Sequence, residues 1–364
     1  MANSVGSGGS KSSAGGSAML TEAAGAGAVG GSAAEGSSGT GTISGGGTTA
    51  GGSASAGQGG SVAGSAAGHT SGGTSGGSGG TSGEGGVAGT GGGSQCCVGR
   101  ASLTAGDSKS TLQHGGRARS YLLHVPSGLA AGTALAVVID LHGASGNGSQ
   151  QKGMSGFSAL SDKKKFLAVF PDGVDGYWNV DDTCCGTAGK EKVDDVGFLK
   201  AIISKLKTDT CIDSKRVYVS GFSNGGGLTH RMGCDAADVI AAIAPMATDL
   251  RTVPCKPARA ISMLEIRGLS DSLEPYAGGL VGPAGGQYTA VGAKASLKLW
   301  ADINSCTGSA SSFEQYCERY TQCGSSVETA LCSLPNVDHS PYGNSLNFDV
   351  ASIAWSLFER QPMK

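Results

Sequence analysis

From about residue 116 onward, short apolar segments alternate with amphipathic ones, and this alternation limits the possible folds more than any other feature of the sequence. The apolar segments have the length of strands and lie at residues 121–125, 136–141, 166–170, 216–219, 240–244, 261–266 and 327–334. Helices are expected after the acidic pair at 194–195, and over residues 224–232, 290–303 and 350–358. Because apolar strands need cover on both faces, the pattern predicts an α/β fold, a mostly parallel sheet with helices on both faces.

The first 94 residues have a different composition. They hold 35 of the 66 glycines, lack Phe, Tyr, Trp, Cys and Pro, and carry only four charged residues, Lys11, Glu22, Glu35 and Glu84. Such a stretch buries too little apolar surface to offset the entropy of ordering it, and its glycines follow no collagen period. We therefore expect a disordered Gly/Ser/Ala/Thr-rich tail or linker at residues 1–94, and one domain with a sizeable core at residues 95–364.

The predicted domain carries 25 basic and 25 acidic residues. Nucleic acids and charged membrane surfaces favour a basic excess, so we expect neither as a partner. No apolar run approaches the roughly 20 residues that span a bilayer, so no transmembrane segment is expected. A flexible tail usually tethers a domain, and we expect this one to lead to a surface anchor or a second module. No signal peptide is visible at the start of the sequence, so we expect that the natural start lies upstream or that Met1 is misplaced.

All 11 cysteines lie at or after Cys96, and none forms a C-x-x-C pair. The usual zinc and redox spacings are therefore missing. Many scattered cysteines in one domain favour disulfides and an oxidising compartment, so we expect an extracellular or cell-surface protein. The odd number leaves at least one thiol free or paired between chains. The alternative is a cytosolic protein with reduced, buried cysteines.

Residues 221–225 match the pattern G-x-S-x-G, with Ser223 at its centre. The same pattern occurs by chance around Ser75 and Ser78 in the glycine-rich tail, so the pattern alone says little. Ser223 differs because it lies between a predicted strand and a predicted helix, which is the arrangement of a nucleophile elbow. An ordinary glycine-rich turn is the alternative. The context favours Ser223 as a catalytic nucleophile.

A serine nucleophile needs a base and an acid, which in this chain order follow the serine. The other histidines lie in the tail, before or within the early strands, or on the helix after Ser223: His69, His114, His124, His142 and His230. Elimination leaves His339, in a loop between the last predicted strand and the last helix, as the base. Asp271 follows the predicted strand at 261–266 and is the first choice for the acid. Glu274 is second, and Asp249 and Asp302 are expected to be loop or surface acids.

The oxyanion of an acyl-transfer reaction needs two backbone N–H donors. One is expected at Asn224, because the first N–H groups of a helix have no partner inside the helix. The second is expected at Ala144, in the glycine loop that follows the strand at 136–141, although a plain glycine loop would look the same. Hydrolysis by such a triad requires no metal and no organic cofactor, so none is expected.

The chain from about Gly116 to Phe358 resembles extracellular α/β-hydrolase esterases of the polyhydroxybutyrate depolymerase-like and feruloyl esterase-like family. The motifs that carry the resemblance are Leu141-His-Gly143, Phe170-Pro-Asp-Gly173 with Trp178-Asn179, Cys184-Cys-Gly186 with Val193-Asp-Asp-Val-Gly-Phe198, Arg216-Val-Tyr-Val-Ser-Gly-Phe-Ser-Asn-Gly-Gly226, and Asp271 with Pro275-Tyr276 and Gly278-Gly279. The resemblance implies an α/β-hydrolase fold and catalysis by Ser223, Asp271 and His339. It also implies a substrate pocket near Trp178, and we expect His142 and Tyr276 to line that pocket.

The resemblance also implies disulfides, Cys234 with Cys255 and Cys211 with either Cys184 or Cys185. Pairings among the last four cysteines cannot be deduced from sequence. The chain departs from the family pattern on both sides of the triad. Arg267 replaces a usual histidine, Ser272 replaces a usual proline after the acid, and Ser340-Pro-Tyr342 replaces a usual Trp-Pro pair after the base.

Together these features predict a secreted serine carboxylic ester hydrolase that works through an acyl-enzyme. The resemblance implies an ester substrate that can be polymeric: feruloyl or acetyl esters of plant polysaccharide, or short hydroxyalkanoate polyesters. Because the chain departs from the family around Asp271 and His339, the alternative is a tethered, non-catalytic binding domain on a degenerate hydrolase frame. The triad itself does not distinguish an esterase from a peptidase.

Overall fold

A ten-stranded sheet forms the centre of the protein in this computed structural model, which describes residues 103–130, 132–182, 184–252, 254–282 and 287–364. The strands of the sheet are β1 (Gly106–His114), β2 (Arg117–Val125), β3 (Leu135–Leu141), β4 (Leu167–Pro171), β5 (Ile212–Phe222), β6 (Ala242–Met246), β7 (Ser262–Gly268), β10 (Ser311–Glu314), β11 (Cys317–Tyr320) and β12 (Thr329–Leu334). Their order is β1-β2-β4-β3-β5-β6-β7-β12-β11-β10. The strands from β4 to β12 run parallel, and antiparallel pairs close both edges.

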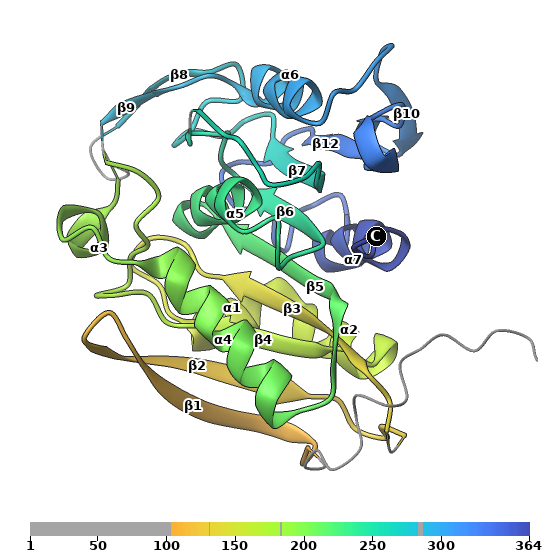
Figure 1. Ribbon diagram of the computed structural model, residues 1–364. Helices are drawn as coiled ribbons and strands as arrows, with labels where there is room; N and C mark the ends of the chain where they lie inside the picture. Colours follow the sequence, from red (N-terminus) through yellow and green to blue (C-terminus); the bar gives the residue numbers. More distant parts are fainter. Residues whose placement is uncertain (1–102, 131, 183, 253, 283–286) are drawn as a thin grey trace, which may run out of the picture. The chain divides into compact units, whose positions relative to one another are not determined.

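Helices cover both faces of this sheet (Figure 1). They are α1 (Gly148–Ser155), α2 (Phe157–Lys164), α3 (Gly186–Lys190), α4 (Asp195–Asp209), α5 (Asn224–Asp235), α6 (Ala293–Ile303) and α7 (Val350–Arg360), with a short 3-10 helix at Gly324–Ser326. Side chains of β3 alternate between the two cores. Val137 and Ile139 pack with α4, α5 and α6, whereas Val138 packs with α2 and α7. The fold is therefore the predicted α/β-hydrolase fold.

The elements that the sequence did not indicate are mostly polar or short. β1 has no apolar run, and most of its residues are exposed, yet it pairs with β2 along its whole length. β10 and β11 form a short edge hairpin, and β8 (Gly279–Val281) pairs with β9 (Tyr288–Ala290) in a separate two-stranded ribbon. The tail predicted for residues 1–94 lies outside the described residues, as does the start of the predicted domain at 95–364, up to residue 102. Among the described residues, no helix has both the length and the apolar character needed to cross a bilayer.

Disulfides fasten the sheet edge and the helices that pack on it. Cys234 pairs with Cys255, as the family resemblance implied. The expected pairing of Cys211 is wrong, because Cys184 and Cys185 are joined to each other, and Cys211 is disulfide-bonded elsewhere. The remaining bonds are Cys306–Cys323 and Cys317–Cys332.

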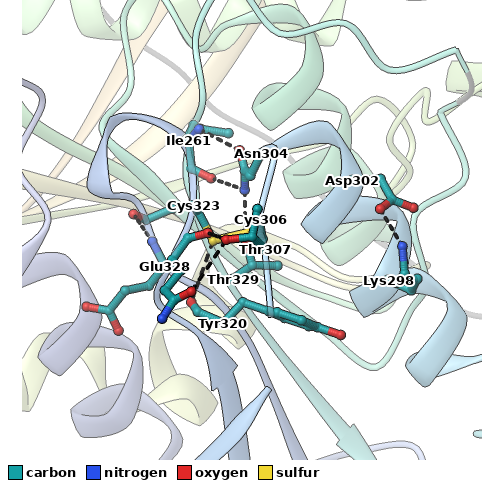
Figure 2. Close-up of a disulfide and its surroundings, with 12 residues drawn as sticks. Ile261, Lys298, Asp302, Asn304, Cys306, Thr307, Tyr320, Cys323, Glu328 and Thr329 are labelled. Carbon is teal, nitrogen blue, oxygen red and sulfur yellow. Dashed lines mark hydrogen bonds and ion pairs between the residues drawn. A yellow bond between two sulfur atoms is a disulfide. The ribbon is translucent and has the colours of Figure 1, made fainter. Parts of the chain in front are cut away.

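Figure 2 shows how Cys306–Cys323 lies beside a polar junction at the end of α6. The side chain of Asn304 accepts a hydrogen bond from Ile261 N (3.0 Å) and donates to Ile261 O (2.9 Å). It also donates to Thr329 Oγ1 at 2.9 Å. Asn304 therefore ties α6 to the segments that enter β7 and β12, the two strands after which the candidate acid and base are placed.

Candidate active site

Ser223 lies in a sharp turn between β5 and α5, with φ of 54° and ψ of −119°. A positive φ is uncommon for a non-glycine residue and stores strain that surrounding contacts must hold. Here Ser223 N donates to Met246 O at the end of β6 (2.8 Å), and Ser223 O accepts from Gly227 N in α5 (2.9 Å). The strained turn pushes the serine side chain out at the carboxyl end of the parallel strands, as the nucleophile-elbow prediction requires.

Glycines let backbone segments meet around this turn. A Cβ at Gly221 would lie 2.6 Å from Thr229 Oγ1, and one at Gly225 would lie 2.7 Å from the carbonyl carbon of Leu141. Real Cβ contacts are longer than 3.0 Å, so neither position has room for a side chain. The first turn of α5 thus packs directly on the end of β3, which brings the loop after β3 next to Ser223.

His339 lies between Ser223 and Asp271 in a continuous chain of hydrogen bonds. Its Nε2 atom is 2.8 Å from Ser223 Oγ, and its Nδ1 atom is 3.0 Å from both carboxylate oxygens of Asp271. The Asp271 side chain is fully buried, and its Oδ1 atom accepts from the N–H groups of Leu273 (3.0 Å) and Glu274 (2.9 Å). The three side chains predicted as a triad are therefore brought together, and Glu274 is not the group beside the histidine.

Asp338 joins the loops that carry the candidate acid and base. Its Oδ1 atom accepts from the backbone N–H (2.8 Å) and the hydroxyl (2.9 Å) of Ser272, and from His339 N (2.8 Å). The bonds from Ser272 are the main cause of the lowered pKa of Asp338. The serine that replaces the family's usual proline thus gains an N–H donor, which proline lacks, and uses it to hold the two loops together.

Ala144 and Asn224, the predicted oxyanion donors, both line the cavity in which Ser223 lies. Gly143 lets this happen, because a Cβ there would meet the Phe222 ring at 2.9 Å and Ser223 Cβ at 3.4 Å. Asn224 begins α5, where a backbone N–H has no acceptor within the helix. Its side chain has a separate task, accepting from Trp178 N (2.8 Å) and donating to Trp178 O (3.1 Å).

The three predicted pocket residues require correction. His142 and Trp178 are buried beneath the loop after β3 and do not line the cavity. His142 Nδ1 donates to Gly143 O (2.7 Å), and Nε2 accepts from Gly173 N (2.9 Å), so its imidazole is neutral, and burial lowers its pKa. Trp178 Nε1 donates to His142 O at 2.9 Å. These two side chains therefore lie beneath the loop after β3 and support it, rather than facing the cavity. Tyr276 is turned toward Ser333, with its hydroxyl 2.6 Å from Ser333 Oγ, and does not line the cavity either.

The cavity in front of Ser223 has a volume of about 540 Å³. One part of its wall is apolar and includes Val180, Phe222, Leu273 and Val281. Another part is polar and comes from the segment after β6, the segment after Asp271, and β9: Thr248, Arg251, Glu274 and Tyr288. The sequence reasoning missed these residues. The rule that ligands lie beyond the carboxyl ends of parallel strands could have indicated Thr248 and Arg251, which follow β6.

The polar wall is held by its own hydrogen bonds. Glu274 accepts from Thr248 Oγ1 (3.2 Å) and Asp249 N (2.8 Å), and the hydroxyl of Tyr288 donates to it at short range. Burial raises the pKa of Glu274. The guanidinium of Arg251 lies 3.4 Å from the centre of the Tyr288 ring. Cations favour such ring faces, so this pair gives the wall a fixed geometry.

Residues 119–277 match the family model described as esterase PHB depolymerase. This segment is therefore similar to that family. Feruloyl esterase B of Piromyces equi is 35% identical over 243 residues, 64% of this chain and 44% of that protein. The putative esterase NocK of Nocardia uniformis subsp. tsuyamanensis is 32% identical over 181 residues, 46% of this chain and 50% of that protein. The chain thus spans half or less of the length of these two curated relatives.

Solved structures agree on the fold. An acetyl xylan esterase from Aspergillus awamori superposes with a TM-score of 0.50 at 14% identity, covering 69% of this chain and 99% of that chain. One departure from the family pattern, Tyr342, also has a structural role. Tyr342, after the candidate base, is 3.0 Å from the amide nitrogen of Gln151 and packs its ring 5.6 Å from that of Phe222, which itself packs on His339.

Proposed function

We propose that the chain is a serine carboxylic ester hydrolase in which Ser223 is the nucleophile, His339 the base and Asp271 the acid. The observation that carries the proposal is the hydrogen-bond chain from Ser223 Oγ through both ring nitrogens of His339 to Asp271. The strained conformation of Ser223 supports it, because such strain persists where it serves a reactive geometry. The match of residues 119–277 to the esterase PHB depolymerase family model supports the choice of ester chemistry.

In the proposed reaction, His339 Nε2 takes the proton of Ser223 as the serine oxygen attacks the ester carbonyl. Asp271 holds the imidazole in the tautomer that has a proton on Nδ1, and it stabilises the imidazolium that forms. The N–H groups of Ala144 and Asn224 would stabilise the oxyanion of the tetrahedral intermediate. His339 then gives this proton to the leaving alcohol, which leaves an acyl group on Ser223. In the second half of the reaction, His339 takes a proton from water as the water attacks the acyl-enzyme, and then returns it to the Ser223 oxygen as the acid product leaves.

For the substrate, we propose feruloyl or acetyl esters on plant-type polysaccharide, or short hydroxyalkanoate polyesters. The curated relative with 35% identity is a feruloyl esterase, and another, 29% identical over 163 residues, is a bifunctional acetylxylan esterase/xylanase. A cavity of about 540 Å³ is in the size range of small-molecule sites and can take one ester-linked group at a time. Because its wall has an apolar part and a polar part, the cavity suits an acyl group that has both apolar and polar portions.

Purified protein and its Ser223→Ala variant, assayed on p-nitrophenyl acetate, test the proposal. We expect hydrolysis by the wild type and a loss of at least about a thousandfold in the variant. Equal background rates would refute the enzyme and leave the non-catalytic binding domain as the better account. Among active preparations, methyl ferulate, acetylated xylan and a hydroxybutyrate oligomer then separate the substrate classes by kcat/KM.

We also propose that the protein works outside the cell or on its surface. Disulfides at Cys234–Cys255, Cys306–Cys323 and Cys317–Cys332 support an oxidising compartment. The glycine-rich N-terminal region would serve as the tether. Fractionation of the source cells with an antibody to the domain tests this, and recovery in the reducing cytosol would contradict it.

A further inference from the structure

Arg267, near the end of β7, is fully buried directly behind the candidate acid. Its Nη2 atom donates to Glu274 O at 2.7 Å and lies 3.9 Å from Asp271 Oδ2. Its Nη1 atom makes a close ion pair with Asp249 and lies 3.5 Å from Glu265. A buried guanidinium with this many partners is costly to remove from water, so its position calls for a physical reason.

The first reason is mechanical. The N–H groups of Leu273 and Glu274 donate to the carboxylate of Asp271 and orient it. Arg267 in turn donates to the backbone carbonyl of Glu274. Residues 271–274 form the turn between these bonds. Arg267, which belongs to β7, fastens this turn to the sheet, and the turn helps to fix the distance between Asp271 and His339.

The second reason is electrostatic. Arginine keeps its charge when buried, so a fixed cation lies 3.9 Å from the carboxylate that contacts His339. This cation attracts the carboxylate of Asp271 and repels positive charge that develops on His339. Asp249, on the far side of the guanidinium, acts in the opposite direction. Burial raises the pKa of Glu265 and of Glu274, which weakens their contribution as anions.

Other titratable groups also face this region. Asp338 is ionised and exposed, and it accepts a hydrogen bond from His339 N. Arg251 and Tyr288 lie beside Glu274, and Tyr276 bonds to Ser333. Burial keeps His230 neutral, with a pKa of about 3, and this side chain lies 3.8 Å from Glu265. Of the cations among these described groups, Arg267 is the one in contact range of Asp271.

We propose that Arg267 is a positioning residue of the candidate triad: it fastens the turn at residues 271–274, and together with Asp249 it sets the electrostatic field beside Asp271 and His339. This inference rests on the proposed function. It differs from a purely structural role, because a structural role would alter stability and would not move the pH profile in a direction fixed by the sign of the charge removed.

The test compares the acidic limb of the kcat/KM profile, which reports protonation of the base in the free enzyme. Asp249→Asn removes the counter-charge and leaves Arg267, so the limb should move to lower pH. Arg267→Met with Asp249→Asn removes both charges and spares the fold an unpaired Asp249, so the limb should move to higher pH. Each shift should be about half a unit or more. The double variant should also lose about tenfold or more in kcat/KM, because the turn loosens.

Two further variants complete the set. Arg267→Lys keeps the charge but loses the forked geometry, so kcat/KM should fall while the limb stays near that of the wild type. Arg259→Met is the matched control, because Arg259 is a partly buried arginine that precedes β7 at its other end and bonds to Ala260 O at 2.8 Å. It should leave the limb and kcat/KM unchanged.

An active wild type whose limb is not moved by either charge-removing variant, or is moved in the same direction by both, overturns the role of Arg267. If the double variant does not fold in a thermal melt, the single Asp249→Asn variant still decides, since an unchanged limb there is enough to reject the proposal. An inactive wild type refutes the ester hydrolase itself, which is a separate outcome.

Discussion

Gly225 offers a sharp test of how the candidate oxyanion loop is positioned. It is the second residue of α5, and a Cβ placed there would lie 2.7 Å from the carbonyl carbon of Leu141 and closer still to the carbonyl oxygens of Leu141 and His142. Leu141 O would lie at 2.5 Å and His142 O nearer still, and ordinary contact begins at 3.4 Å, so Gly225→Ala must separate α5 from the end of β3 by about 1 Å. The atoms that must move are backbone, and backbone cannot turn aside as a flexible side chain does.

The expected change in stability is the difference of two effects. Alanine is a better helix former than glycine by about 1 kcal/mol, which favours the variant. Overpacking against a rigid neighbour costs about 1–3 kcal/mol, and here the neighbour is the central strand β3, fully buried along its length. We therefore expect a net loss of up to about 2 kcal/mol in the free energy of unfolding.

The expected loss of activity is larger than this stability change would suggest. The displaced carbonyls belong to the residues that lead into Ala144, so the variant should shift one proposed oxyanion donor relative to Ser223. A misplacement of this size costs about a hundredfold in rate when it affects groups that contact the reacting atoms. Thermal unfolding and kcat/KM on p-nitrophenyl acetate measure the two quantities separately.

Gly153→Ala is the matched control. Gly153 also lies inside a helix, α1, but a Cβ there would meet nothing within 4 Å. We expect this variant to gain about 0.5–1 kcal/mol and to keep full activity. If Gly225→Ala proved as stable and as active as Gly153→Ala, the close approach of α5 and β3 would not control the loop, and the reasoning would be wrong.

Three other changes have defined outcomes. Asp271→Asn should lower kcat by about a thousandfold to ten-thousandfold with little change in the thermal midpoint, because the amide favours the wrong tautomer of His339; a loss below tenfold would exclude Asp271 as the acid. Burial raises the pKa of Asp140 from 3.8 to about 7, so the folded state retains a proton that the unfolded state releases, and stability should fall as pH rises between about 4 and 7. Asp140→Asn should remove that slope and gain up to about 4 kcal/mol above pH 7, measured by urea unfolding at several pH values; an unchanged slope would contradict the burial argument. Replacing Cys317 and Cys332 by serine should cost about 3 kcal/mol, because the bond closes a loop with a sequence separation of 15, and it should leave kcat/KM at 25 °C unaltered; no change in the melting temperature would refute it.

The sequence was sufficient for those parts of the site that depend on strand ends. Ser223, Asp271 and His339 each follow a strand of the parallel region, β5, β7 and β12, and parallel strands end at one edge of the sheet. Residues that are 116 and 68 positions apart therefore meet within hydrogen-bond distance. The central strands could be predicted because their apolar runs are continuous in the sequence.

The pocket wall depended on information that no local pattern carries. Trp178 is an aromatic residue of a type that often binds ligands, but its ring is completely buried, and its indole N–H donates to His142 O. Tyr288 lines the cavity from a three-residue strand, β9, that has neither the length nor the apolar run of a predicted strand. Which side of a loop faces a cavity is set by packing against distant segments, so these assignments required the three-dimensional arrangement.

Arg267 shows where the two kinds of information meet. In sequence it was a departure from a family pattern beside the candidate acid, and a change in such a flank can signal a degenerate site. In the structure the same guanidinium bonds to the turn that orients Asp271, while Ser272, a second departure, bonds through Asp338 to the loop of His339. Both replacements connect the acid to its neighbours, so neither leaves Asp271 or His339 without supporting contacts. The flanking changes therefore favour a site in which acid and base are held by contacts of their own, and the pH profile is the measurement that tests whether these contacts matter for the reaction.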